Sequence, residues 1–85
     1  MDRILQAVED LLDEEEEIVL CDDFEEAFMG IARQFNKPFA IYDREKCLEI
    51  LEKDMPYEVA LEYFSYNVEG AYMGDHTPAF LSFPS

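Results

Sequence analysis

Apolar residues recur at helical spacing in the N-terminal segment, from Asp2 to about Glu14. These positions fall on one side of a helix with 3.6 residues per turn, and they are Ile4, Leu5, Val8, Leu11 and Leu12. The pattern predicts an amphipathic helix. The apolar run that follows it, residues 18–21, is expected to be a short strand or a buried connection.

A second helical pattern occupies residues 23–35. Asp23 and Glu26 have the spacing of a capping box, and the Asn-Lys-Pro sequence at 36–38 stops a helix. The apolar stripe of this segment consists of Phe24, Ala27, Phe28, Ile31, Ala32 and Phe35. We therefore expect a second helix whose stripe faces the core.

Two further helices are predicted after a buried strand at 39–42. Asp43 is a suitable N-cap for a third helix, whose inward face is Cys47, Leu48, Ile50 and Leu51. Pro56 breaks that pattern and suits the first position of a fourth helix, which Gly70 or Gly74 ends. The inward face of the fourth helix is expected to comprise Val59, Ala60, Tyr63, Phe64, Asn67 and Val68.

Residues 78–83 predict a last strand, which we expect to pair with the strand at 39–42 beneath the helices. The predicted fold is α+β: about four helices packed on a small two-stranded sheet, in a single domain covering 1–85. A chain of 85 residues with 49% hydrophobic residues can form a core, although a small one. There is no apolar run of about 18 residues and no signal peptide at the N-terminus, so a soluble, cytoplasmic protein is expected.

Charge is the most unusual property of the chain. It has 21 acidic and six basic residues and a net charge of −15. Residues 1–26 contain twelve of the acids and one base, Arg3, which is a net charge of −11 in less than a third of the chain. Direct binding to nucleic acid is disfavoured because this field would repel phosphates.

Little in the sequence points to catalysis, a metal or a cofactor. Asp75 and His76 are the one pair that could serve a hydrolase, and a turn is the simpler interpretation. The acids at 22–26 lack the ligand spacing of a calcium loop. Cys21 and Cys47 are too few for a disulfide framework and are interpreted as small hydrophobic residues. We expect no enzyme activity, no metal site and no cofactor.

The stretch from about Phe24 to Leu81 resembles a family of short phage and bacterial proteins that have no assigned activity. The resemblance rests on the sequences YDREKCLEIL at 42–51, EYFSYNVEGAYMG at 62–74 and TPAFL at 77–81. It implies a phage or prophage origin and therefore a protein that acts on host machinery. Residues 24–81 are then the family-like core, and the acidic segment 1–26 is an elaboration of this member.

These observations lead to the hypothesis of a nucleic-acid mimic. B-DNA carries about one charge per 1.7 Å, or roughly 18 over the 30 Å diameter of a small domain, which is comparable to −15. The expected partner is a host protein with a basic nucleic-acid-binding groove, as in an anti-CRISPR or anti-restriction inhibitor acting in the host cytoplasm. The predicted partner-binding residues are Asp13, Glu14, Glu15, Glu16, Glu17, Asp22, Asp23, Glu25 and Glu26.

Two other interpretations stay open. The protein could be a phage structural or regulatory adaptor that docks through the aromatic and apolar face of the fourth helix and the last strand, with the acids serving solubility. Tyr63, Tyr66, Tyr72 and Asn67 would form its recognition patch, although we favour Tyr63, Phe64 and Tyr72 in the core and Tyr66 at its rim. The third interpretation is an enzyme or metal-dependent hydrolase that uses Asp75 and His76. The sequence does not indicate whether the chain is a monomer or a dimer.

Overall fold

A mixed sheet of three strands organises the fold in the computed structural model, which describes residues 2–71 and 74–84. Strands β1 (Phe28–Gln34) and β2 (Lys37–Asp43) are antiparallel, and β3 (Ala79–Leu81) joins the other edge of β2 in parallel. The helices are α1 (Asp2–Leu11), α2 (Arg44–Glu52) and α3 (Tyr57–Phe64). A 3₁₀ turn, η1 (Glu25–Ala27), precedes β1, and a π-helical turn, η2 (Ser65–Glu69), extends α3.

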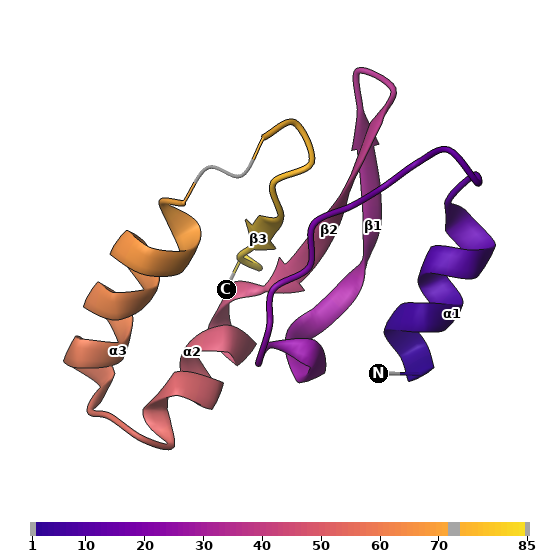
Figure 1. The fold of residues 1–85 in the computed structure, drawn as a ribbon. Helices are drawn as coiled ribbons and strands as arrows, with labels where there is room; N and C mark the ends of the chain where they lie inside the picture. The colour runs from indigo at the N-terminus through magenta and orange to yellow at the C-terminus, as the bar shows by residue number, and fades with distance from the viewer. Residues whose placement is uncertain (1, 72–73, 85) are drawn as a thin grey trace.

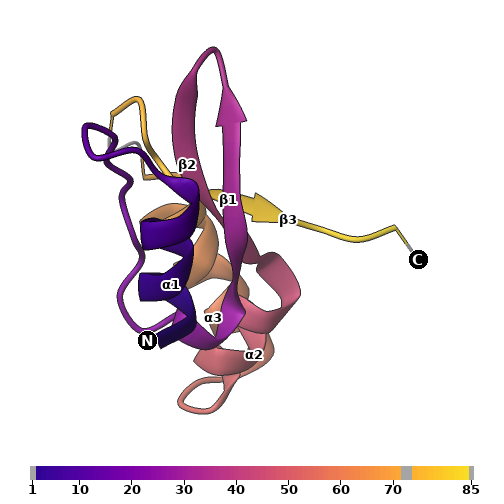
Figure 2. The same cartoon turned by 90° about the vertical axis from the view of Figure 1, so that its right-hand side faces the viewer.

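The elements form two layers. Helices α1 and α3 lie on the same face of the sheet, and residues 12–24 cross that face between them (Figure 1). Viewed along the sheet, no helix of the described residues covers the opposite face (Figure 2). The two faces of the sheet therefore have very different surroundings.

The expected four helices on a two-stranded sheet are wrong: there are three α-helices and a three-stranded mixed sheet. The segment predicted as the second helix is η1 followed by β1. A β-bulge between Phe28 and Gly30 places an additional residue in β1, so the inward-facing Phe28 and Ile31 are three positions apart instead of two. This spacing imitates helical periodicity.

The turn between β1 and β2 was also not predicted from the sequence. Phe35 and Asn36 connect the strands, and both have positive φ, 55° and 63°, as a two-residue type I′ hairpin requires. Asn tolerates this conformation, whereas a bulky residue such as Phe rarely adopts it. Phe35 was expected in the buried stripe, but its side chain is 86% exposed at the tip of the hairpin.

The bounds of the remaining elements follow the predictions, but Val59 and Tyr63, which were expected on the inward face of the last helix, are exposed. The strand at 39–42 lies within β2 and pairs with the last strand, with Ile41 opposite Ala79 and Tyr42 opposite Phe80. The Asp43 carboxylate caps α2 by accepting a hydrogen bond from the Lys46 N–H at 3.3 Å. Gly70 follows η2, where the last helix ends. The position requires glycine, because a Cβ there would lie 2.7 Å from the Ser65 carbonyl oxygen. Pro56 precedes α3 as its N-cap residue and does not occupy its first turn.

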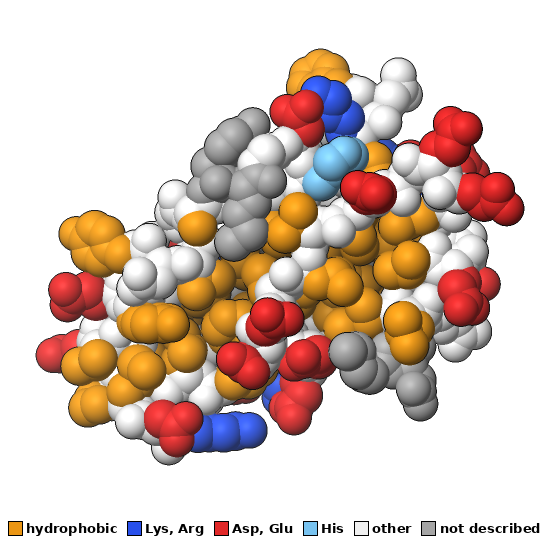
Figure 3. Space-filling model, viewed as in Figure 1, with side chains coloured by type: hydrophobic (Ala, Val, Ile, Leu, Met, Phe, Trp, Pro, Cys, Tyr) orange, Lys and Arg blue, Asp and Glu red, His pale blue; other side chains and the backbone are white. Residues whose placement is uncertain are grey.

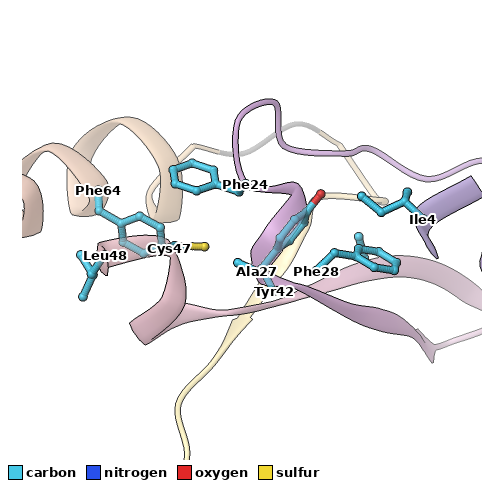
Figure 4. Close-up of a cluster of buried hydrophobic side chains, with 9 residues drawn as sticks. Ile4, Phe24, Ala27, Phe28, Tyr42, Cys47, Leu48 and Phe64 are labelled. Carbon is cyan, nitrogen blue, oxygen red and sulfur yellow. The ribbon is translucent and has the colours of Figure 1, made fainter. Parts of the chain in front are cut away.

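The core is a connected set of aromatic rings between the sheet and the helices (Figure 4). Phe64 of α3 contacts Phe24 and Phe80, with ring centroids 6.2 and 5.0 Å apart. Tyr42 of β2 contacts Phe80 and Phe28, with centroids 5.9 and 5.8 Å apart. The buried residues of this cluster are Ile4, Phe24, Ala27, Phe28, Ala40, Tyr42, Cys47, Leu48 and Phe64. One core thus joins α1, α2, α3 and all three strands.

Candidate protein-binding surface

The nine predicted partner-binding acids form two groups. Asp13–Glu17 lie in the loop after α1, and Asp22, Asp23, Glu25 and Glu26 lie in the turn before β1 and in η1. The segment that crosses the front of the sheet separates the groups, so the fold does not gather them into one cluster (Figure 1). Glu16 and Glu25 are half-buried, and the other seven acids are exposed.

Glu16 attaches the first acidic group to the sheet. One of its carboxylate oxygens accepts a hydrogen bond from Arg33 of β1, and the other accepts one from the Asp13 N–H at 2.9 Å. Arg33 also donates to the Leu11 carbonyl oxygen at the end of α1. The hydrogen bond from Arg33, followed by that from Asp13, lowers the pKa of Glu16 below its ordinary value. Glu16 therefore positions the loop that presents its exposed neighbours.

The second acidic group borders a cleft of about 740 Å³. Its apolar lining comes from Leu20, Cys21, Phe24, Ile50, Leu51 and Val68, and its polar lining from Asp22, Asp23, Lys53, Asp54, Tyr63 and Asn67. Asp23 has a φ of 72°, a conformation that Asp and Asn adopt more readily than most residues. The predicted role of Asp23 as a helix cap is wrong, since η1 has no side-chain cap and the residue before it is Phe24.

The cleft brings part of the acidic surface together with part of the aromatic patch. Tyr63, which was expected in the core, is 46% exposed, whereas Phe64 is buried and Tyr66 is 77% exposed. Asn67 and Tyr63 line both the cleft and a shallow neighbouring pocket with Val59, Glu62 and Tyr66. Tyr72 lies outside the described residues. The sequence did not indicate that these residues would share a cleft, because Asp22 and Tyr63 are some 40 positions apart.

Figure 3 shows how charge and apolar surface divide on this side of the molecule. Hydrophobic side chains occupy much of the centre of the view, and acidic side chains lie in its lower middle and around its margins. Ion pairs among the described residues are Arg33–Glu16, Lys37–Asp75, Arg44–Glu69 and Lys46–Glu49. Of the nine predicted acids, Glu16 alone takes part in one of these pairs. The surface thus presents carboxylates whose charge is not neutralised by the described bases.

The possible catalytic pair has other contacts. His76 Nδ1 lies 2.7 Å from the Pro38 carbonyl oxygen, which requires a proton on that nitrogen, and the Asp75 carboxylate binds Lys37 Nζ at 2.8 Å. Both residues attach their loop to the start of β2. Within residues 2–71 and 74–84, no group of three or more His, Cys, Asp or Glu side chains is arranged to hold a metal ion.

Cys47 is a free thiol within the core, and Cys21 is a half-buried free thiol packed against it. Burial raises the pKa of Cys47 to about 12 and that of Cys21 to about 11. Both thiols therefore stay protonated at neutral pH and are poor nucleophiles.

Comparisons with protein-family models, curated protein sequences and solved structures found no match to this chain. No helix in the described part of the chain is long and apolar enough to cross a membrane. The interpretation of the surface thus rests on its own geometry and chemistry.

Proposed function

We propose that the protein is a non-enzymatic acidic binding module that occupies the basic groove of a host nucleic-acid-binding protein and so excludes the nucleic acid. The observation that carries the proposal is the set of nine carboxylates at 13–26, seven of them exposed, of which Glu16 alone forms one of the ion pairs found among the described side chains. The resemblance to phage proteins favours a target in host defence or DNA processing, such as a restriction enzyme or an RNA-guided nuclease.

The size and charge of the molecule support mimicry. The longest dimension is 41 Å, over which B-DNA would present about 24 phosphate charges. A net charge of −15 on that length is somewhat more than half of the charge of DNA. A field of this strength steers a basic partner toward the molecule and raises the association rate.

The cleft adds a place where contact can be specific. Its apolar lining suits the aliphatic stem of a Lys or Arg side chain, and Asp22, Asp23 and Asp54 suit the charged end. Tyr63 supplies an aromatic surface beside these carboxylates, and aromatic residues are common anchors in protein interfaces. In this proposal the loop at 13–17 acts on association, and the cleft acts on dissociation.

Displacement of DNA tests the proposal. A short fluorescent duplex is bound in turn to an RNA-guided nuclease, a restriction endonuclease and a histone-like protein, and the purified chain is titrated in. We expect displacement from at least one of them, weakened by added salt. Displacement from none of the three, or displacement that is insensitive to salt, would contradict the proposal.

A matched pair of variants separates local acidity from total charge. The triple variant E14Q/E15Q/E17Q removes three charges from the loop, and E45Q/E52Q/E58Q removes the same number from exposed positions of α2 and α3. The loop variant should displace the duplex about tenfold less well, mainly through slower association. Equal effects of both variants would mean that only net charge matters.

The adaptor remains a second candidate because the aromatic patch is exposed. Tyr63 and Tyr66 project from α3 and η2, and Leu81 and Phe83 are exposed at the last strand and just after it. An adaptor would bind its partner equally well at low and high salt, and it would lose binding in Tyr66→Ala while tolerating E14Q/E15Q/E17Q.

A further inference from the structure

The uncovered face of the sheet is defined by the strand register. In β2, Pro38, Ala40 and Tyr42 are buried toward the helices, so the alternate residues Phe39 and Ile41 point to the opposite side. Their neighbours across the sheet point the same way. This outer sheet face consists of Gly30, Ala32, Phe39, Ile41, Ala79 and Leu81.

The outer sheet face is apolar where a solvated face would be polar. Antiparallel sheets with one face in water normally alternate hydrophobic inward and polar outward residues. Here polar outward side chains occur only at the ends of the strands, at Gln34, Lys37 and Asp43. The residues that pack against the core include Ile31 and Phe80 but, in the described chain, neither Phe39 nor Ile41. Phe39 and Ile41 are half-buried outside this core, so core packing alone does not explain these two large side chains.

The centre of the outer sheet face is also poor in negative charge for this chain. No acidic residue occurs between Ala27 and Tyr42, although 21 are present in 85 residues. The acids at the margins of the face include Asp43, at the end of β2, and Asp75, which is paired with Lys37 and lines a pocket beside Phe39. Elsewhere the exposed carboxylates would repel a second copy of the chain, whereas two copies can approach at this face with the least repulsion.

We propose that the outer sheet face is a self-association surface, which packs against the same face of a second copy of the chain. A two-fold axis that places β2 of one copy over β1 of the other would set the large Phe39 and Ile41 against the small Ala32 and Gly30. The residues after β3 project beyond the sheet on the side away from α1 (Figure 2), and Phe83 there is 58% exposed. The acidic surfaces of both copies stay outward, so the dimer presents two anionic surfaces.

Sedimentation equilibrium of the purified chain tests the proposal without any other partner. We expect a reversible monomer–dimer equilibrium that strengthens severalfold between about 0.1 and 1 M NaCl, since the screening length shortens from about 10 to about 3 Å and the repulsion between copies falls. This sign is opposite to that expected for binding a basic protein. A monomer at both salt concentrations would overturn the proposal and leave the proposed function intact.

Substitutions on the face provide the second arm. Ile41→Glu should raise the dimer dissociation constant by at least about tenfold, and Ile41→Thr, which suits a strand, should weaken the dimer with a circular dichroism spectrum like that of the parent. Tyr66→Glu is the control, because it adds the same charge at an exposed position of η2 and should retain most of the dimer. If Ile41→Thr is as dimeric as the parent, or if it unfolds, the face has another role and the proposal fails.

Discussion

The phenol oxygen of Tyr42 accepts a hydrogen bond from the backbone N–H of Cys21 at 2.8 Å, across 21 positions of the chain. Tyr42 lies fully buried in the central strand, and Cys21 immediately precedes Asp22 and Asp23 at the edge of the cleft. This hydrogen bond, together with the packing of Phe24 on Phe64, therefore holds the second acidic group next to α2 and α3. The position of the candidate surface depends on the packing of Tyr42.

Tyr42→Phe should destabilise the protein by about 1–2 kcal/mol, because the Cys21 N–H loses its acceptor in a partly buried place. For a domain of this size, Tm falls by about 4–8 °C for each kcal/mol of lost stability. Thermal unfolding measures the effect, and hydrogen exchange at the Cys21 amide should accelerate. Tyr66→Phe is the control, since Tyr66 is exposed and should tolerate the change. An unchanged Tm in Tyr42→Phe would show that the hydrogen bond contributes nothing.

Phe35→Asn should stabilise the fold. A left-handed conformation costs most L-residues roughly 1–2 kcal/mol, and Asn tolerates it far better than Phe. Because Phe35 buries little of its side chain, we expect Tm to rise by about 4 °C or more. Phe83→Asn removes an exposed Phe outside the hairpin and should leave Tm nearly unchanged. A lower Tm in Phe35→Asn would mean that the ring stabilises the turn by packing.

The Glu16–Arg33 pair predicts a pH dependence of stability. The pKa of Glu16 is lowered in the folded state, so the unfolded state binds the proton first as the pH falls. The stabilisation of the fold by the Glu16–Arg33 pair is complete at neutral pH. It is lost as the pH falls through the region below the ordinary Glu pKa of 4.5. Glu16→Gln should therefore melt below the parent at pH 7, and the difference in Tm should shrink as the pH falls below 4.5. Glu14→Gln, which changes an exposed carboxylate outside the ion pairs, should show no such convergence; parallel curves for Glu16→Gln would contradict the assignment.

Alkaline pH should destabilise the protein through three buried groups. Burial raises the pKa of Tyr42 to about 12, as it does for Cys47, and that of Cys21 to about 11. The unfolded chain then loses these protons at lower pH than the folded chain, so stability falls as the pH rises from about 9 toward 12. Urea unfolding between pH 8 and pH 10.5, with thiol labelling in parallel, measures both effects. Labelling of native Cys47 as fast as in urea would show that the thiol is not protected.

The sequence was sufficient where a local signal coincided with the final structure. Asp43 is an N-cap by residue type, Pro56 interrupts a helical pattern, and Gly70 is the residue that the turn after α3 can accommodate. The pairing of β2 with β3 could also be predicted, because both apolar segments were expected to be strands of one small sheet. The density of acids in residues 1–26 needed no tertiary information.

Segment 24–35 was misread because two local exceptions acted together. The bulge between Phe28 and Gly30 converted a strand's alternation into a helix-like spacing, and the hairpin turn carries Phe35 where Asn or Gly is usual. Neither exception is visible until the partner strand determines the register.

Only the tertiary structure decided which surfaces exist. Asp22 and Tyr63 share a cleft because Tyr42 and Phe24 attach their segments to one core. The same packing leaves Phe39 and Ile41 on a face without a helix. Periodicity shows that a residue alternates between two sides, but the side that is covered depends on where distant helices pack.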